Sequence, residues 1–154
     1  MGWLTLPVFR LEIRLHLGLF LACLALWFFN PDLVPRYALL LSVLFVHEVA
    51  HGVASLALGA RSASVSIWPL FGRANVEAWT DRREAWVALA GPLANLVVAG
   101  LLALFTAARP SLDLAHAPLR DLMLTAHLAM GVVNLIPIPP IDGGRVVRAL
   151  RRGA

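Results

Sequence analysis

Hydrophobic residues are gathered in four long runs, which cover residues 15–29, 37–58, 85–108 and 119–136. Runs of this kind are typical of membrane-spanning helices, since about 20 apolar residues cross the hydrocarbon core of a bilayer. The first run is short for a complete span, and the flanking Leu11 and Ile13 are expected to extend it. The pattern therefore predicts an all-α polytopic membrane protein with about four transmembrane helices, in a single domain over residues 1–154.

Helix-ending residues follow each run. The breaks are Asn30-Pro31-Asp32 after the first run, Gly59 after the second, Arg109-Pro110 after the third, and Pro137, Pro139 and Pro140 after the fourth. Each of these breaks is typical of a loop, because these residues favour turns or cannot continue a helix. A final short helix is expected over residues 143–152.

The segment between the second and third runs has a different pattern. Residues 62–68 alternate small polar and apolar side chains, which is the periodicity of a strand. Pro69 and Gly72 mark a turn, and residues 74–79 are expected to return as a second strand. We predict a β-hairpin or re-entrant loop that dips toward the membrane, where such backbone must lie against protein or a water-filled cavity. An ordinary interfacial loop is the alternative that the pattern leaves open.

The composition agrees with a membrane protein. Of the 154 residues, 60% are hydrophobic and 14% are charged, whereas soluble domains have about 45–50% and about 25%. All basic residues are arginines, and they show no patch interleaved with exposed aromatics, so nucleic acid is not an expected partner. The single cysteine, Cys23, excludes an intrachain disulfide and is expected to be a small buried residue.

Arginines are concentrated in the N-terminal segment, the predicted hairpin and the C-terminal tail. These arginines are Arg10, Arg14, Arg61, Arg73, Arg82, Arg83, Arg145, Arg148, Arg151 and Arg152. With four spans, the three segments share one side of the membrane. The positive-inside rule therefore predicts that both termini are cytoplasmic.

Two histidines and a glutamate occur together inside the second run, as His47-Glu48-Val49-Ala50-His51. On a helix, residues four apart lie on one face, so His47 and His51 can bind one metal ion together. Glu48 lies beside them, where a general base for an attacking water is placed in such sites. A pair of neutral histidines hydrogen-bonded between helices would not explain Glu48, because a buried carboxylate needs a cation or a proton. Ionisable groups are costly in a bilayer, and this cluster indicates function.

A catalytic zinc site needs three protein ligands and an open position, so a third ligand is expected from another helix. The strongest candidate is Asp142, which follows the prolines of the fourth run and precedes two glycines. Capping the next helix is the alternative role for this aspartate, and the histidine pair favours the ligand role. Four other residues are weaker candidate ligands. The ordinary role of His127 is a core ring, that of His16 and His116 is an interfacial ring, and that of Glu77 is a solvated carboxylate.

Several segments resemble motifs of the site-2 protease family of intramembrane zinc metalloproteases. His47 to His51 is similar to the HExxH helix of that family, residues 134–144 match its NxxPxPxxDGG motif, and residues 90–95 resemble its GPxxN element. Residues 67–72 resemble the segment leading into its hairpin turn, and residues 14–16 the start of its preceding helix. The likeness covers nearly the whole chain in the same order. Phe71 departs from it, since many relatives carry glycine there.

The resemblance implies that His47, His51 and Asp142 bind one Zn²⁺ per chain and that Glu48 is the catalytic base. The implied function is an intramembrane endopeptidase of a bacterial or archaeal cell membrane, acting on single-span, membrane-tethered proteins. Relatives usually continue further, often with a PDZ-like or nucleotide-sensing domain. The sequence leaves open whether this chain is a natural minimal member or is trimmed at its C-terminus.

The resemblance also implies roles for three residues around the metal. Asn95 and Asn134 would face the active site, where they position substrate or stabilise the oxyanion. Interhelical hydrogen bonding is an equal alternative for both. The hairpin around Gly72 would pair with an unwound substrate segment by strand addition.

Two other functions are compatible with four apolar helices. A catalytically inactive membrane binding protein or chaperone of the same fold would need no metal, and the retained Glu48 argues against it. A metal transporter usually contains internal repeats, which this sequence lacks.

Overall fold

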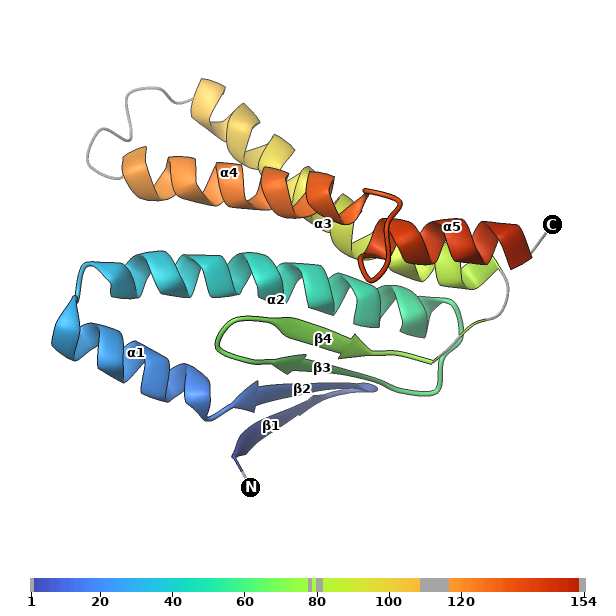
Figure 1. Cartoon of the computed structure of the whole chain (residues 1–154), viewed down its shortest axis with the longest axis horizontal. Helices are drawn as coiled ribbons and strands as arrows, with labels where there is room; N and C mark the ends of the chain where they lie inside the picture. Colours follow the sequence, from blue (N-terminus) through green and yellow to red (C-terminus); the bar gives the residue numbers. More distant parts are fainter. Residues whose placement is uncertain (1, 78, 80–81, 109–116, 153–154) are drawn as a thin grey trace.

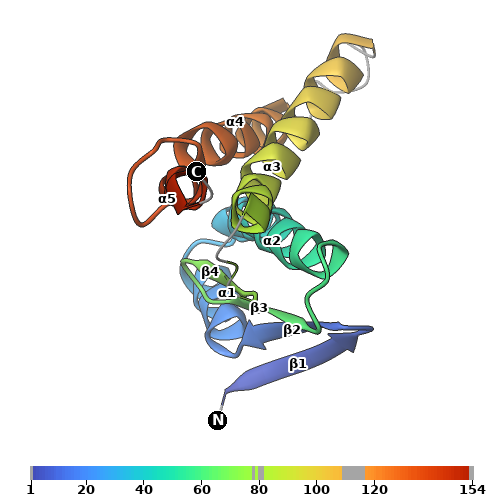
Figure 2. The same cartoon turned by 90° about the vertical axis from the view of Figure 1, so that its right-hand side faces the viewer.

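The computed structural model describes residues 2–77, 79, 82–108 and 117–152. In chain order, it contains β1 (Trp3–Val8), β2 (Leu11–His16), α1 (Gly18–Phe29), α2 (Leu33–Ala57), β3 (Ala63–Ile67), β4 (Gly72–Asn75), α3 (Arg82–Ala108), α4 (Ala117–Asn134) and α5 (Asp142–Arg152). Helix α2 occupies the middle of the molecule, with the sheet on one side and α3, α4 and α5 on the other (Figures 1 and 2). The helix that carries the two histidines therefore contacts both layers.

The helices lie close to the predicted runs. The second and third runs become α2 and α3, the fourth becomes α4, and the short C-terminal helix is α5. Gly59 follows the end of α2 with a φ of 104°, a backbone conformation that glycine adopts without steric cost. The predicted break at Arg109-Pro110 lies outside the described residues.

The all-α prediction is wrong, because the strands form a four-stranded sheet in the order β1-β2-β3-β4. The first two strands pair antiparallel, β2 pairs parallel with β3, and β3 pairs antiparallel with β4. The predicted hairpin is present as β3 and β4, but its second strand starts at Gly72 rather than at residue 74. Its turn is tighter than expected, because the Trp68 N–H already donates to the Phe71 carbonyl oxygen at 2.8 Å.

The N-terminal strands replace residues that were expected to extend the first helix. Leu11 and Ile13 belong to β2, and α1 begins only at Gly18. In β2, apolar residues alternate with polar ones, which places all apolar side chains on one face of a strand. That face packs against α2. The core cluster there consists of Leu11, Leu19, Ala63, Val65 and Ile67, with Ile13, Leu15, Leu41, Leu44 and Val49 packed around it.

Two of the described helices are long and apolar enough to cross a membrane. Helix α2 has 25 residues with a mean hydropathy of 1.7, and α3 has 27 residues with a mean hydropathy of 2.1. Large apolar side chains are also exposed along α1 and α3, among them Trp27, Phe28, Phe29, Val97, Leu101, Leu104 and Phe105. Soluble monomers rarely expose apolar surface on this scale. These features agree with a membrane protein, and the count of four crossings stays a prediction.

Candidate metal centre

Helix α2 places its two histidine rings on the face that meets α3 and α5. The side chains of His47 and His51 are buried, and their Nε2 atoms lie 3.2 Å apart. The Nδ1–H of His51 donates to the carbonyl oxygen of Val87 in α3, at 2.7 Å. This bond leaves the lone pair of His51 Nε2 directed toward His47.

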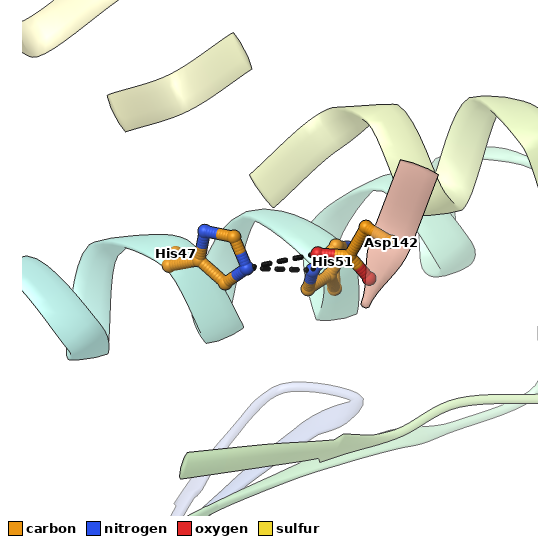
Figure 3. Close-up of side chains that lie close together, drawn as sticks. All are labelled: His47, His51 and Asp142. Atoms are coloured by element: carbon orange, nitrogen blue, oxygen red, sulfur yellow. Dashed lines mark hydrogen bonds and ion pairs between the residues drawn. The ribbon is translucent and has the colours of Figure 1, made fainter. Parts of the chain in front are cut away.

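The third candidate ligand comes from the first residue of α5. Asp142 is buried, and its Oδ2 lies 3.0 Å from His47 Nε2 and 3.1 Å from His51 Nε2 (Figure 3). Two glycines after Asp142 allow this approach, since a Cβ at Gly143 would clash with the backbone oxygens of Leu135 and Ile136. Ninety-five residues separate His47 from Asp142, and the fold brings them into contact.

These three side chains fit a zinc ion by the chemistry and spacing of their donor atoms. Within the described residues, His47, His51 and Asp142 form a group whose ligand atoms lie within 4.8 Å of one another. Ligands at about 2.0–2.1 Å from a tetrahedral zinc lie about 3.3 Å from one another, close to the separations seen here. Two imidazoles and a carboxylate are also among the donor types that zinc prefers.

Other polar side chains hold the ligands in place. Arg145 donates from Nη1 to Asp142 Oδ1 at 3.0 Å and from Nε to Glu84 Oε1 at 3.0 Å, which leaves Asp142 Oδ2 for the histidines.

Asn95 connects the metal histidines to a third ring. It is fully buried, with 3.2 Å between its Nδ2 and His47 Nδ1 and 3.1 Å between its Oδ1 and His127 Nδ1. His127 is also fully buried, and its Nε2 has no hydrogen-bond partner among the described residues. The ordinary role expected for His127 was a core ring, and the ring is buried in the core beside Asn95.

Glu48 and the hairpin form one wall of a cavity beside the histidines. The cavity has a volume of about 520 Å³, and its lining includes His47, Glu48, His51, Gly72, Ala74, Asn134 and Asp142. Glu48 is partly buried, and the backbone N–H of Ala74 lies within hydrogen-bonding reach of its carboxylate. A Cβ at Gly72 would lie 2.6 Å from Glu48 Cγ, so only glycine allows β4 to pass this close to the carboxylate.

The remaining sequence candidates lie elsewhere or make other contacts. Asn134 lines the cavity, but its Nδ2 donates to the Met130 carbonyl oxygen at 2.9 Å. The His16 ring stacks on Trp68, and its Nδ1 accepts the Gly18 N–H at 3.0 Å, away from the metal ligands. Of the other residues, Glu77 is exposed after β4, and His116 lies outside the described residues. Cys23, which was expected to be buried, is half-buried in α1.

Sequence reasoning gave no role to Gly91 or Arg145, and both contact the ligands. A Cβ at Gly91 would clash with His51 Nε2 and lie 2.9 Å from His47 Cε1, so α3 can reach the rings only through a glycine. The GPxxN resemblance pointed to this segment, but it did not indicate that Gly91 is needed for the close approach of α3 to the two rings. Arg145 follows Asp142 by three residues, and that helical spacing was the signal available for their ion pair.

Comparison with known proteins places this geometry in context. No protein-family model matches the chain. The chain is 36% identical over 119 residues to Rip3 of Mycobacterium tuberculosis, covering 72% of this chain and 29% of Rip3. It is 29% identical over 118 residues to the zinc metalloprotease MJ0392 of Methanocaldococcus jannaschii, covering 74% of this chain and 34% of MJ0392. It is 27% identical over 143 residues to stage IV sporulation protein FB of Bacillus subtilis, covering 89% of this chain and 47% of that protein.

The fold has a solved counterpart. The structure superposes on the site-2 protease from Methanocaldococcus jannaschii with a TM-score of 0.72 at 24% identity, covering 97% of this chain and 71% of that one. The chain spans about a third of the length of the first two relatives. Together, the sequence relatives and the shared fold confirm the resemblance read from the motifs, and the chain belongs to the site-2 protease family.

Proposed function

We propose that this chain is an intramembrane zinc endopeptidase, which hydrolyses peptide bonds in or near the transmembrane segments of membrane-tethered proteins. The observation that carries the proposal is the convergence of His47, His51 and Asp142 beside Glu48, in a cavity that also contains the edge of a strand. The names of its relatives agree, since MJ0392 is called a zinc metalloprotease and the solved counterpart a site-2 protease.

The metal is assigned to His47, His51 and Asp142, with one Zn²⁺ per chain. When bound, Zn²⁺ supplies a Lewis acid that polarises a peptide carbonyl and acidifies water. Coordination through Nε2 places the proton of the His47 ring on Nδ1. The amide oxygen of Asn95 accepts that proton once the amide is turned by 180°, because the two ends of an amide are nearly equal in shape. We therefore assign Asn95 to orienting His47 rather than to contact with substrate.

Glu48 is proposed as the base. Its carboxylate takes a proton from the attacking water, whose oxygen forms the new bond to the peptide carbon. The same carboxyl then gives the proton to the leaving nitrogen as the C–N bond breaks, so that the protons balance. The N–H of Ala74 holds the carboxylate toward the cavity. Asn134 can donate to the developing oxyanion only after its amide releases Met130.

The outer edge of β4 is proposed to bind the unwound substrate. The hydrogen bond between Trp68 and Phe71 means that the next pair, Ile67 and Gly72, is not hydrogen-bonded. By alternation, Gly72 and Ala74 direct their backbone N–H and C=O groups away from β3. The Ala74 N–H lies within reach of the Glu48 carboxylate, so the Gly72 N–H and the two carbonyl groups are left for a substrate strand. Within the described residues no strand pairs with that edge. A substrate strand added there would lie beside Glu48.

The membrane arrangement is proposed to include four crossings. Helices α2 and α3 are long enough to span a bilayer, α4 with 18 residues is about 27 Å long, and α1 with 12 residues is about 18 Å long. A bilayer core is about 30 Å thick, so α1 crosses only with its neighbouring residues or a locally thinner bilayer. The arginine-rich hairpin and α5 are placed on the cytoplasmic side with both termini.

Removal of the metal tests this function directly. We expect the purified chain in lipid vesicles to cleave a co-reconstituted single-span reporter, and a zinc chelator to abolish cleavage. Zinc added back in slight excess should restore the rate, since the ligands are the chain's own side chains. Reporter cleavage is followed by gel electrophoresis and mass spectrometry. An unchanged rate in chelator would contradict the proposal, and zinc binding without any cleavage would favour the inactive binding protein.

Replacement of Asn95 by Ala tests its assigned role. We expect zinc affinity to fall by about 10–100-fold, the usual effect of losing a residue that orients a ligand. Affinity is measured by competition with a chromophoric chelator. Asn95→Asp should retain most of the affinity, because its carboxylate still accepts the His47 Nδ1 proton. Equal losses in both variants would show that Asn95 matters only for packing.

A further inference from the structure

A second cavity continues from the metal cavity along the edge of β4. It has a volume of about 510 Å³ and lies between β4, with the residues that follow it, and α5. The two cavities share the lining residues Arg73, Ala74 and Arg145, so they lie next to each other, and we call the second cavity the groove. A polypeptide that pairs with β4 beside Glu48 must leave through this groove or in the opposite direction.

The groove beyond the metal is basic. Arg73, Arg148 and Arg152 line it with exposed side chains, and none of them forms an ion pair or a hydrogen bond with another described residue. Arg145 lines it too but is committed to Asp142 and Glu84. Arg145 pairs with Glu84, so among the described residues of this lining Glu77 is the acidic side chain left to oppose the three other arginines. The groove therefore carries a net positive charge along its length.

The other end of the metal cavity has the opposite character. A cavity of about 460 Å³ between α2 and α4 meets it at Asn134 and is lined almost entirely by apolar side chains, including Leu40, Leu44, Leu70 and Val133. The path through the site thus runs from an apolar wall, past the metal ligands, to a basic groove. This change from an apolar to a basic lining matches a substrate whose apolar segment ends near the cleaved bond.

We propose that the groove of Arg73, Arg148 and Arg152 binds an acidic segment of the substrate, directly next to the bond that is cleaved. The inference rests on the proposed protease function and specifies its substrate class. Membrane proteins usually carry Lys and Arg next to a span on the cytoplasmic side. Such flanks would be repelled here, so the groove both selects acidic flanks and rejects ordinary ones.

A peptide fits the groove better than an anionic lipid headgroup does. The groove adjoins the metal cavity, and it is lined by Ala74 and Asn75 of β4 and by the following Val76, at a strand edge with which no described strand pairs. Main-chain pairing along that edge is a feature that a peptide uses and a headgroup does not. Binding of anionic lipid is treated as an outcome of the test.

Binding is measured first, on the full chain carrying Glu48→Gln so that no peptide is consumed. The probes are fluorescent peptides with one apolar segment and a flank of four residues, either Asp/Glu, Asn/Gln or Lys. In zwitterionic detergent we expect the acidic peptide to bind about tenfold more tightly than the neutral one, from a few partly exposed charge pairs. The Lys peptide should bind more weakly than the neutral one, and added salt should reduce both differences.

Variants then locate the effect. The double substitution Arg148→Glu/Arg152→Glu should reverse the preference toward the Lys flank. The matched control is Arg151→Glu, an exposed arginine of the same helix that does not line the groove, and it should leave the preference unchanged. Reversal by the double variant but not by the control supports the proposal. Equal binding of all three flanks, or equal effects of both variants, overturns it.

Cleavage by the wild-type chain separates the two hypotheses. If acidic flanks bind preferentially but nothing is cleaved with zinc present, the groove assignment stands and the protease function fails. If every flank is cleaved at the same kcat/KM, the protease function stands and the groove assignment fails. If the double variant alters activity only in vesicles with anionic lipid, whatever the flank, the groove is assigned to lipid and the proposal is overturned.

Discussion

Replacement of Glu48 by Gln is expected to lower kcat by about 10²–10⁴-fold, the contribution of a positioned general base. Glutamine has the same shape, so its contact with Gly72 is kept while the proton acceptor is lost. The zinc content should not change, because Glu48 is not one of the three ligands. The rate is measured on a reconstituted reporter, and zinc is measured by elemental analysis of the same samples.

The matched control for this variant is Asp121→Asn, which changes an exposed carboxylate of α4 that lines neither the metal cavity nor the basic groove. It should keep at least most of the wild-type kcat. A Glu48→Gln protein that cleaves at the wild-type rate would remove Glu48 from the mechanism. A protein that loses zinc together with activity would show instead that the substitution disturbs the metal ligands.

Replacement of Gly91 by Ala is expected to have a comparably large effect through the ligands themselves. The added Cβ would lie 2.7 Å from His51 Cε1 and 2.9 Å from His47 Cε1, and closer still to His51 Nε2. Both rings are buried and cannot move aside without leaving their partners. Zinc affinity should fall by at least about 100-fold, with activity lost in parallel. Competition with a chromophoric chelator measures this change.

Gly100→Ala is the control on the same helix, since a Cβ there meets no atom within 4 Å. Because alanine favours a helix over glycine by about 1 kcal/mol, this variant should be slightly more stable than wild type and fully active. Equal zinc affinity in the two variants would show that the rings have more room than the structure gives them.

The metal ligands could be predicted from the sequence because each belongs to a local pattern. The spacing of His47 and His51 places them on one helical face whatever surrounds the helix. Asp142 was harder, since its contact with His47 depends on how α5 packs against α3, which in turn packs against α2. It could be proposed because a zinc site needs a third ligand and the chain offers few carboxylates near a predicted helix end.

The sheet was predicted only in part, for a physical reason. The hairpin of β3 and β4 is local, and its turn residues Pro69 and Gly72 were visible. Strand β2 was missed because its apolar residues adjoin a longer apolar run, although its strict alternation was a usable signal. Its parallel partner β3 lies beyond two helices, and such pairings leave no local mark in a sequence.

The second layer of contacts around the ligands could not be predicted. The sequence left contact with substrate and interhelical hydrogen bonding as equal alternatives for Asn95, which lies fully buried between His47 of α2 and His127 of α4. Which face of α3 meets which face of α2 decides this contact, and α3 is apolar around its whole circumference, so that its sequence does not distinguish the faces. The role of Gly91 has the same origin.

The zinc content of the purified chain, compared with that of Asp142→Ala, shows whether His47, His51 and Asp142 bind one metal ion together. We expect about one zinc per wild-type chain and almost none in Asp142→Ala, because two histidines alone leave the site one ligand short. Asp121→Ala, which removes an exposed carboxylate on α4, should retain the wild-type content. A wild-type chain without zinc after purification in zinc-containing buffer, or an Asp142→Ala chain that holds it as tightly as wild type, would contradict the account.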